Sequence, residues 1–143
     1  MVRRPQRQAL ILGLLAALSV AFAPGSAAAA SEAPVVTRHE ARVEGRALGY
    51  TAEIGRIAIR DVETGEPQGF MGYVAYRVAA KGQPRPVMFV WNGGPGANSS
   101  LLHFSTVGPK RIDGAKLVDN EDSWLSAADL VFVDPVGTGF SRP

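Results

Sequence analysis

The feature that most constrains this chain is a glycine loop placed directly after an apolar run. Residues 87–91 contain no polar side chain, and the run ends at Asn92-Gly93-Gly94-Pro95-Gly96. A polar Asn98-Ser99-Ser100 and two leucines follow. This order predicts a strand covered on both faces, a tight loop and the start of a helix. Glycines at the end of a buried strand also let a ligand approach bare backbone N–H groups.

The first half of the chain is predicted to be antiparallel β structure. Apolar and polar residues alternate between residues 39 and 78, with turn signals at residues 44–46 and 61–67. Alternation between clusters of Gly, Pro and Asp is typical of strands joined as hairpins. Residues 31–37 are expected to be a flexible lead. No residue of this half is assigned a catalytic role.

The second half predicts the beginning of an α/β layer. A short helix is expected from about Asn98 or Ser99, both good N-cap residues, to the Gly108-Pro109 terminator, followed by an irregular polar connection over residues 110–124. Residues 130–133 are predicted to be a second buried strand, which ends at another glycine loop, residues 134–141. The predicted fold class is therefore α/β, with antiparallel β hairpins leading into a mixed central sheet.

The first 30 residues have the three parts of a secretory signal peptide. Three arginines and no acid precede an apolar run over residues 9–23, and small residues that suit a cleavage site lead to Ser31. The run is shorter than the roughly 20 residues of a membrane span. We therefore expect residues 1–30 to be removed, residues 31–143 to remain without a stable membrane anchor, and the protein to be periplasmic or secreted.

Cleavage also narrows the classes of partner and cofactor. Loss of three arginines lowers the formal net charge from +2 to −1, so the mature part offers no basic stripe for nucleic acid. The chain has no cysteine, which excludes disulfides and thiolate metal sites. His39 and His103 stand too far apart in the sequence to predict a metal cluster. No metal and no other cofactor are expected.

The glycine loop at residues 92–96 fits an oxyanion or another anion better than a nucleotide phosphate. The P-loop pattern needs a Lys followed by Ser or Thr, and the dinucleotide pattern needs G-x-G-x-x-G; neither spacing is present. Pro95 also removes one backbone donor. A donor at Gly94 remains, with the side-chain amide of Asn92 beside it. Glycine spacing alone leaves a purely structural turn equally open.

The other polar residues near these loops do not form a catalytic set. Asp134 follows the second buried strand and is expected to pair with the turn after it. His103 stands among apolar residues and is expected to be packed rather than to act as a base. Ser141 lacks the G-x-S-x-G setting of a nucleophile elbow.

Four segments in this order resemble the serine carboxypeptidase family, which has the α/β-hydrolase fold. They are residues 92–99 after the apolar run, Gly108-Pro109, residues 120–124 (Asn-Glu-Asp-Ser-Trp) and residues 134–141. The resemblance covers about residues 40–143. The direct Asp134-Pro135 sequence and the absence of cysteine are similar to the bacterial branch of the family.

The resemblance implies roles for three loop residues. Gly94 corresponds to the glycine whose backbone N–H forms half of the oxyanion hole. Asn92 and Gly93 correspond to residues that bind the C-terminal carboxylate of the peptide substrate. An amide and a backbone N–H suit a carboxylate without burying a cation. Ala97-Asn98 departs from the family's usual Cys-Ser or Ser-Ser, but this change removes no backbone donor.

The resemblance also implies that residues 31–143 are the N-terminal portion of a longer serine-type carboxypeptidase. The family carries its nucleophile in a G-E-S-Y-A-G-like elbow farther along the chain, and the Ser/Asp/His triad has no counterpart here. The chain alone is therefore expected to be inactive and prone to aggregation, with an open sheet edge at residues 130–133. Two alternatives stay open: an esterase or acyltransferase of the same fold, and a non-catalytic, secreted β-rich module.

Overall fold

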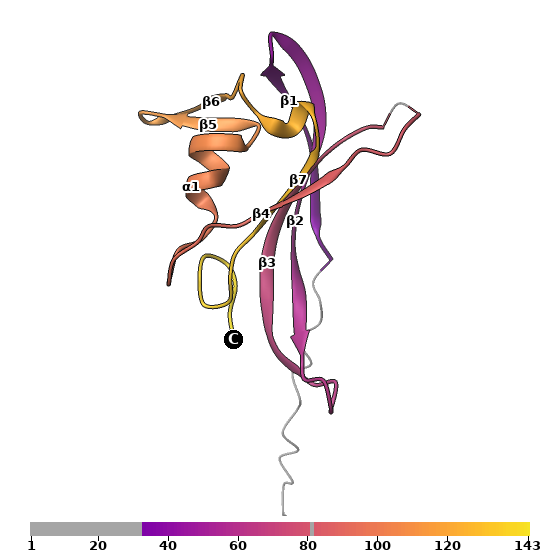
Figure 1. Cartoon of the computed structure of the whole chain (residues 1–143), viewed down its shortest axis with the longest axis vertical. Helices are drawn as coiled ribbons and strands as arrows, with labels where there is room; N and C mark the ends of the chain where they lie inside the picture. Colours follow the sequence, from indigo (N-terminus) through magenta and orange to yellow (C-terminus); the bar gives the residue numbers. More distant parts are fainter. Residues whose placement is uncertain (1–32, 81) are drawn as a thin grey trace, which may run out of the picture.

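A computed structural model describes residues 33–80 and 82–143, so the predicted signal peptide lies outside the described residues. Its main feature is a five-stranded sheet with the strand order β1-β2-β3-β7-β4, accompanied by a β5-β6 hairpin (Figure 1). The strands and helices are β1 (Val35–Val43), β2 (Arg46–Arg60), β3 (Pro67–Val78), β4 (Val87–Val90), α1 (Ser100–Leu102), the π-helical turn η1 (His103–Val107), β5 (Lys110–Asp113), β6 (Lys116–Asp119), the 3-10 turn η2 (Trp124–Ser126) and β7 (Asp129–Val133).

The first three strands form the predicted antiparallel meander. β1 and β2 meet at a tight turn in which Glu44 and Gly45 both have positive φ, 49° and 71°. The turn between β2 and β3 is held by Asp61, whose Oδ1 accepts the backbone N–H groups of Glu63 and Thr64 at 2.9 and 2.8 Å. The flexible lead expected up to residue 37 is wrong at its end, because Val35 already pairs with β2.

The sheet is mixed because β7 is antiparallel to β3 and parallel to β4. The strand predicted over residues 130–133 is confirmed. The open edge predicted there is wrong, because β7 lies between β3 and β4 and the outer strand is β4. The two-sided covering predicted for residues 87–91 is also wrong within the described residues: Val87 and Phe89 are 55% and 62% exposed, and only Val90 is buried.

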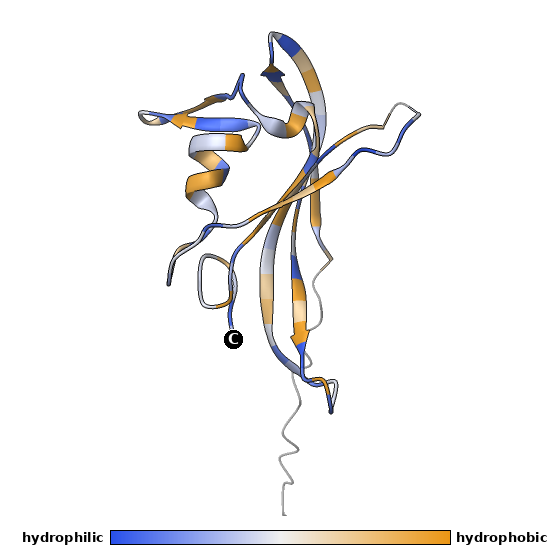
Figure 2. Ribbon diagram, viewed as in Figure 1, coloured by the Kyte–Doolittle hydropathy of each residue, from blue (hydrophilic) through white to orange (hydrophobic). Residues whose placement is uncertain are grey.

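The core lies on one face of this sheet. The α1–η1 helical segment and the β5-β6 hairpin lie together on one side of the strands (Figure 1). The buried apolar cluster includes Val43, Tyr50, Leu125, Leu130 and Phe132. On the β3-β7-β4 part of the sheet, Met71, Phe89, Trp91 and Val133 line an open apolar hollow. Figure 2 shows apolar residues along β4 and at the lower end of β2.

The β5-β6 hairpin corrects the expectation that residues 110–124 are irregular. Lys110–Asp113 pairs with Lys116–Asp119 around Gly114, whose φ is +58°. Asp-Gly is a strong hairpin turn signal, but charged residues on both sides obscured the strand alternation.

Among residues 33–80 and 82–143, none of the helices has the length and hydropathy that a membrane span requires.

Candidate active site

The two glycine loops lie at the same edge of the sheet. Residues 92–96 follow β4, and residues 134–141 follow β7. Because β4 and β7 run parallel, with Val90 opposite Phe132, their carboxyl ends point to the same edge. Figure 1 shows both loops below the α1 segment. Ligands of open α/β sheets bind at this edge, outside the carboxyl ends of the strands.

The first loop is an exposed turn built on left-handed glycines. Gly94 and Gly96 have φ values of +92° and +80°, which glycine adopts without strain. A weak turn hydrogen bond joins the Ala97 N–H to the Gly94 carbonyl oxygen at 3.4 Å. Within residues 33–80 and 82–143, the hydrogen bonds of this loop include none from the Gly94 N–H. Asn92 is partly buried, whereas Gly93 and Gly94 are exposed.

The helix after this loop starts where the sequence predicts, but its polar residues have different tasks. Asn98 Oδ1 accepts the Ser100 N–H at 3.1 Å and so caps the segment. Ser99 is the N-terminal boundary residue, and its side chain makes no cap. Instead the buried Ser99 hydroxyl donates to the Val133 carbonyl oxygen at the end of β7. Ser99 therefore attaches the helix to the neighbouring strand.

Asp134 joins the second loop to the start of the helix. Its Oδ2 accepts the Phe140 N–H at 3.0 Å, which confirms the predicted pairing with the following turn. Its Oδ1 accepts the Ser99 N–H at 3.0 Å, a link across 35 residues that the sequence did not reveal. The Asp134 carbonyl oxygen accepts the Ser141 hydroxyl at 2.6 Å. Ser141 is buried and holds the loop, as expected for a serine outside a nucleophile elbow.

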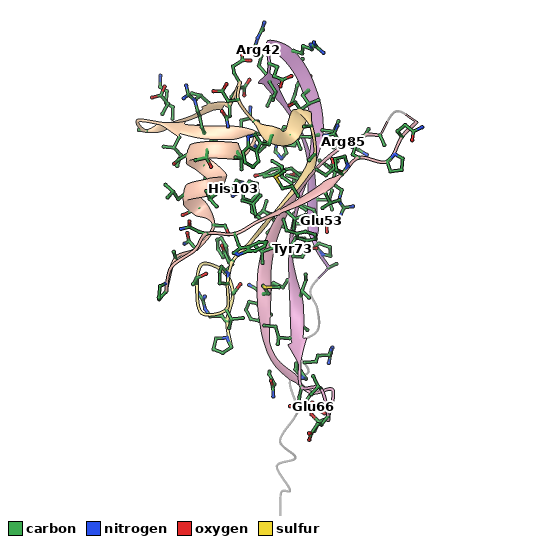
Figure 3. The ribbon with its side chains drawn as sticks, viewed as in Figure 1. Arg42, Glu53, Glu66, Tyr73, Arg85 and His103 are labelled. Carbon is green, nitrogen blue, oxygen red and sulfur yellow. The ribbon has the colours of Figure 1, made fainter. Side chains whose placement is uncertain are left out.

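His103 is a packed histidine, as predicted. Its Nε2 lies 2.5 Å from the Tyr76 hydroxyl oxygen, and its ring stacks on Phe132 and Phe104 with centroid distances of 4.3 and 3.9 Å. Burial lowers the pKa of His103 to about 4, and the nearby Asp134 carboxylate opposes the shift. Figure 3 shows His103 on the helical segment. Its ring is 7% exposed and is committed to the core.

Two of the segments that resemble the family, Gly108-Pro109 and residues 120–124, contact each other at the C-terminal end of the helix. The side-chain amide of Asn120 donates to the carbonyl oxygens of Thr106 and Gly108 at 2.7 and 2.8 Å. The Ser123 hydroxyl donates to the Val107 carbonyl oxygen at 2.9 Å. A Cβ on Gly108 would lie 2.1 Å from the His103 carbonyl oxygen, so the close turn requires glycine. These segments are structural, a role that their spacing alone did not reveal.

The described residues supply backbone donors at the sheet edge. The hydroxyls of Ser99 and Ser141 are bonded to carbonyl oxygens, and His103 faces Tyr76. No group of three or more potential metal ligands is present among residues 33–80 and 82–143. Gly93 and Gly94 are exposed at this edge, and the Gly94 N–H is the candidate backbone donor there.

Comparison with known proteins gives a consistent assignment. A family model described as serine carboxypeptidase matches residues 62–143, more than half of the chain. The pheromone-processing carboxypeptidase KEX1 of Verticillium alfalfae is 52% identical over 54 residues, 36% of this chain and 8% of that protein. Serine carboxypeptidase-like 36 of Arabidopsis thaliana is 38% identical over 84 residues, 56% of this chain and 17% of that protein. KEX1 of Saccharomyces cerevisiae is 48% identical over 59 residues, 40% and 8% of the two chains.

The chain spans less than a fifth of the length of these curated relatives. The residues matched by the family model include both glycine loops, the helix between them and the Asn120–Ser123 contacts. The order of the four segments, their contacts and the family match agree with one another. The chain belongs to the serine carboxypeptidase family.

Proposed function

We propose that residues 31–143 are the N-terminal portion of an exported serine-type carboxypeptidase that releases C-terminal amino acids from peptides through an acyl-enzyme. Family membership and the small share of each relative that the chain spans support this proposal. The nucleophile, base and acid would come from a later part of the enzyme. Export depends on the signal-peptide pattern, and a mature N-terminus at Ser31, measured by mass spectrometry, would be its direct test.

The backbone N–H of Gly94 is proposed to form half of the oxyanion hole. In acylation, the base takes the serine hydroxyl proton as the serine oxygen bonds to the scissile carbonyl carbon, and the C=O electron pair moves onto the carbonyl oxygen. Collapse then breaks the C–N bond, and the base returns its proton to the leaving amine. A preorganised donor stabilises the negative oxygen and contributes about 10²- to 10³-fold to kcat. The observation that carries this proposal is the exposed, left-handed Gly94 at the carboxyl end of the parallel β4–β7 pair.

Asn92 and Gly93 are proposed to bind the C-terminal carboxylate of the substrate. The Asn92 amide supplies a side-chain donor, and Gly93 supplies a backbone donor next to it. A Cβ on Gly93 would meet nothing within 4 Å, and its φ lies outside the left-handed region. The described structure thus gives no packing or backbone reason for glycine at position 93, which is consistent with space reserved for a ligand.

Replacement of Asn92 tests the proposed substrate class. In the full-length enzyme, we expect Asn92→Ala to lower kcat/KM for peptides with a free C-terminal carboxylate by about 10- to 100-fold, the value of a hydrogen bond to a charged group. Hydrolysis of the same peptides with an amidated C-terminus should be slow in the wild type and unchanged in the variant. Gln83→Ala, at an exposed position in the β3–β4 connection, is the matched control.

Two outcomes would contradict this proposal in different ways. An equal loss on free and amidated substrates would show that Asn92 does not act on the carboxylate. A wild-type protein that hydrolyses simple esters without preference for a free carboxylate would favour the esterase alternative.

A further inference from the structure

We infer that Asp134 is a positioning residue, which fixes the Gly94 loop through the start of the following helix. The inference rests on the proposed role of Gly94 in the oxyanion hole. Asp134 itself does not touch the substrate in this scheme. Its effect is transmitted through Ser99, which lies five residues after Gly94 in the chain.

The carboxylate of Asp134 bridges two segments by using one oxygen for each. Oδ1 accepts the backbone N–H of Ser99, and Oδ2 accepts the backbone N–H of Phe140, both at 3.0 Å. Hydrogen bonds to a charged acceptor are stronger than neutral ones. The start of the helix is therefore held by a group that is itself fixed at the end of β7.

The surroundings of Asp134 hold this carboxylate in place. The Ser141 hydroxyl donates to the Asp134 carbonyl oxygen at 2.6 Å and accepts the Gly72 N–H of β3 at 2.8 Å. A Cβ on Gly139 would lie 1.9 Å from Asp134 Oδ2, so only glycine lets this loop approach the carboxylate. The Ser99 hydroxyl adds a second bond to the end of β7, at the Val133 carbonyl oxygen.

The segment between Val90 and Ser99, which contains Gly94, is held in place at its two ends. At one end Val90 pairs with Phe132 in the parallel β4–β7 ladder, and at the other end Ser99 is bound to Asp134 and Val133. Between them, the backbone–backbone bonds include only the long one between Ala97 and Gly94. The direction of the Gly94 N–H thus depends on where the two ends are held. Displacement of a reacting group by about 1 Å can cost about 100-fold in rate.

Asp134→Asn tests this dependence with almost no change in size. Two backbone N–H groups require two acceptor oxygens, whereas an asparagine amide offers one acceptor and one donor. One of the two backbone N–H groups would therefore face the NH2 group of the asparagine side chain and lose its acceptor. We expect kcat to fall about 10- to 100-fold while KM stays within about twofold, because substrate binding at Asn92 and Gly93 does not use the oxyanion donor.

The matched control is Asp61→Asn. Asp61 also accepts two backbone N–H groups, from Glu63 and Thr64, but in the β2–β3 turn. The Asp61→Asn variant should have the same kcat and KM as the wild type. Hydrogen–deuterium exchange of residues 91–100 is the second readout, and it should accelerate in Asp134→Asn and not in Asp61→Asn. Ser99→Ala, which removes the bond to Val133, is the second variant and should show the same kcat-specific loss to a smaller extent.

The outcomes separate this inference from the proposed function. An active wild-type carboxypeptidase whose Asp134→Asn variant keeps its kcat and its exchange rates would overturn the positioning role alone. A loss in kcat/KM that comes entirely from a higher KM, with kcat unchanged, would also overturn the positioning role alone. These measurements use the full-length enzyme that includes the later catalytic residues. A full-length wild-type enzyme without carboxypeptidase activity would overturn the proposed function, and the positioning role with it.

Discussion

His103 makes folding stability depend on pH in a range where carboxylates contribute little. The ring is 7% exposed, and burial lowers its pKa from the ordinary 6.5 to about 4. A group with a depressed folded-state pKa binds its proton more readily when the protein is unfolded. Stability from a neutral His103 is therefore complete above about pH 6.5 and is lost progressively as the pH falls toward 4.

The size of the effect follows from the two pKa values. Each pKa unit corresponds to about 1.36 kcal/mol, so the shift to about 4 limits the loss to about 3 kcal/mol. Linkage predicts a loss of about 1 kcal/mol by pH 5.5 and of about 2 kcal/mol by pH 4.5, relative to neutral pH. Asp134 is the opposing charge and stabilises the protonated ring in part.

The assay is urea unfolding of the wild type and His103→Gln from about pH 7.5 to 4.5. Glutamine can bond the Tyr76 hydroxyl but does not titrate, so the stability difference between the two proteins isolates the ring. Wild-type stability should fall relative to His103→Gln by about 2 kcal/mol over this range. His39→Gln is the matched control, since His39 is exposed and bonded to Thr37. A stability difference that does not change with pH would refute the reasoning.

Two further substitutions test the contacts at the far end of the helix. Asn120→Ala should lower the free energy of unfolding by about 2 to 4 kcal/mol, measured by denaturant titration, because a buried carbonyl oxygen at Gly108 and a partly buried one at Thr106 lose their donor. Asn98→Ala, which removes an exposed cap, should cost only about 1 kcal/mol. Gly108→Ala should lower the melting temperature strongly, because the added Cβ would lie 2.1 Å from the His103 carbonyl oxygen. Gly49→Ala is the control and should change the melting temperature little, because no atom lies within 4 Å of its Cβ. Equal effects of the two glycine substitutions would contradict the packing argument.

Local patterns predicted the strands well where turn chemistry and alternation agreed. The Glu44-Gly45 turn and the alternation on both sides of it correctly indicated the β1–β2 pair. The same approach missed β5 and β6, although Asp113-Gly114 marks their turn, because charged residues make up three of the four residues of β5 and two of the four residues of β6. The burial of β4 was overpredicted. An apolar run indicates that the side chains of a strand could be buried, but it does not indicate which elements cover them.

Long-range contacts at the site could not be predicted from spacing. The sequence indicated a turn partner for Asp134, since Asp often bonds the backbone just after it. It did not indicate Ser99, because that contact exists only after β4 and β7 pair in parallel. The packing of His103 was predictable from its apolar neighbours. The roles of Asn92, Gly93 and Gly94 stay predictions from the family resemblance.

The helix from Ser99 to Val107 is held at both ends through its main chain. Asp134 binds the Ser99 N–H, while Asn120 and Ser123 bind carbonyl oxygens at the other end. Outward-facing side chains such as Leu101, which is 58% exposed, take no part in this attachment. Substitution of those side chains should therefore leave the position of the segment on the sheet unchanged, because its attachment depends on the main chain.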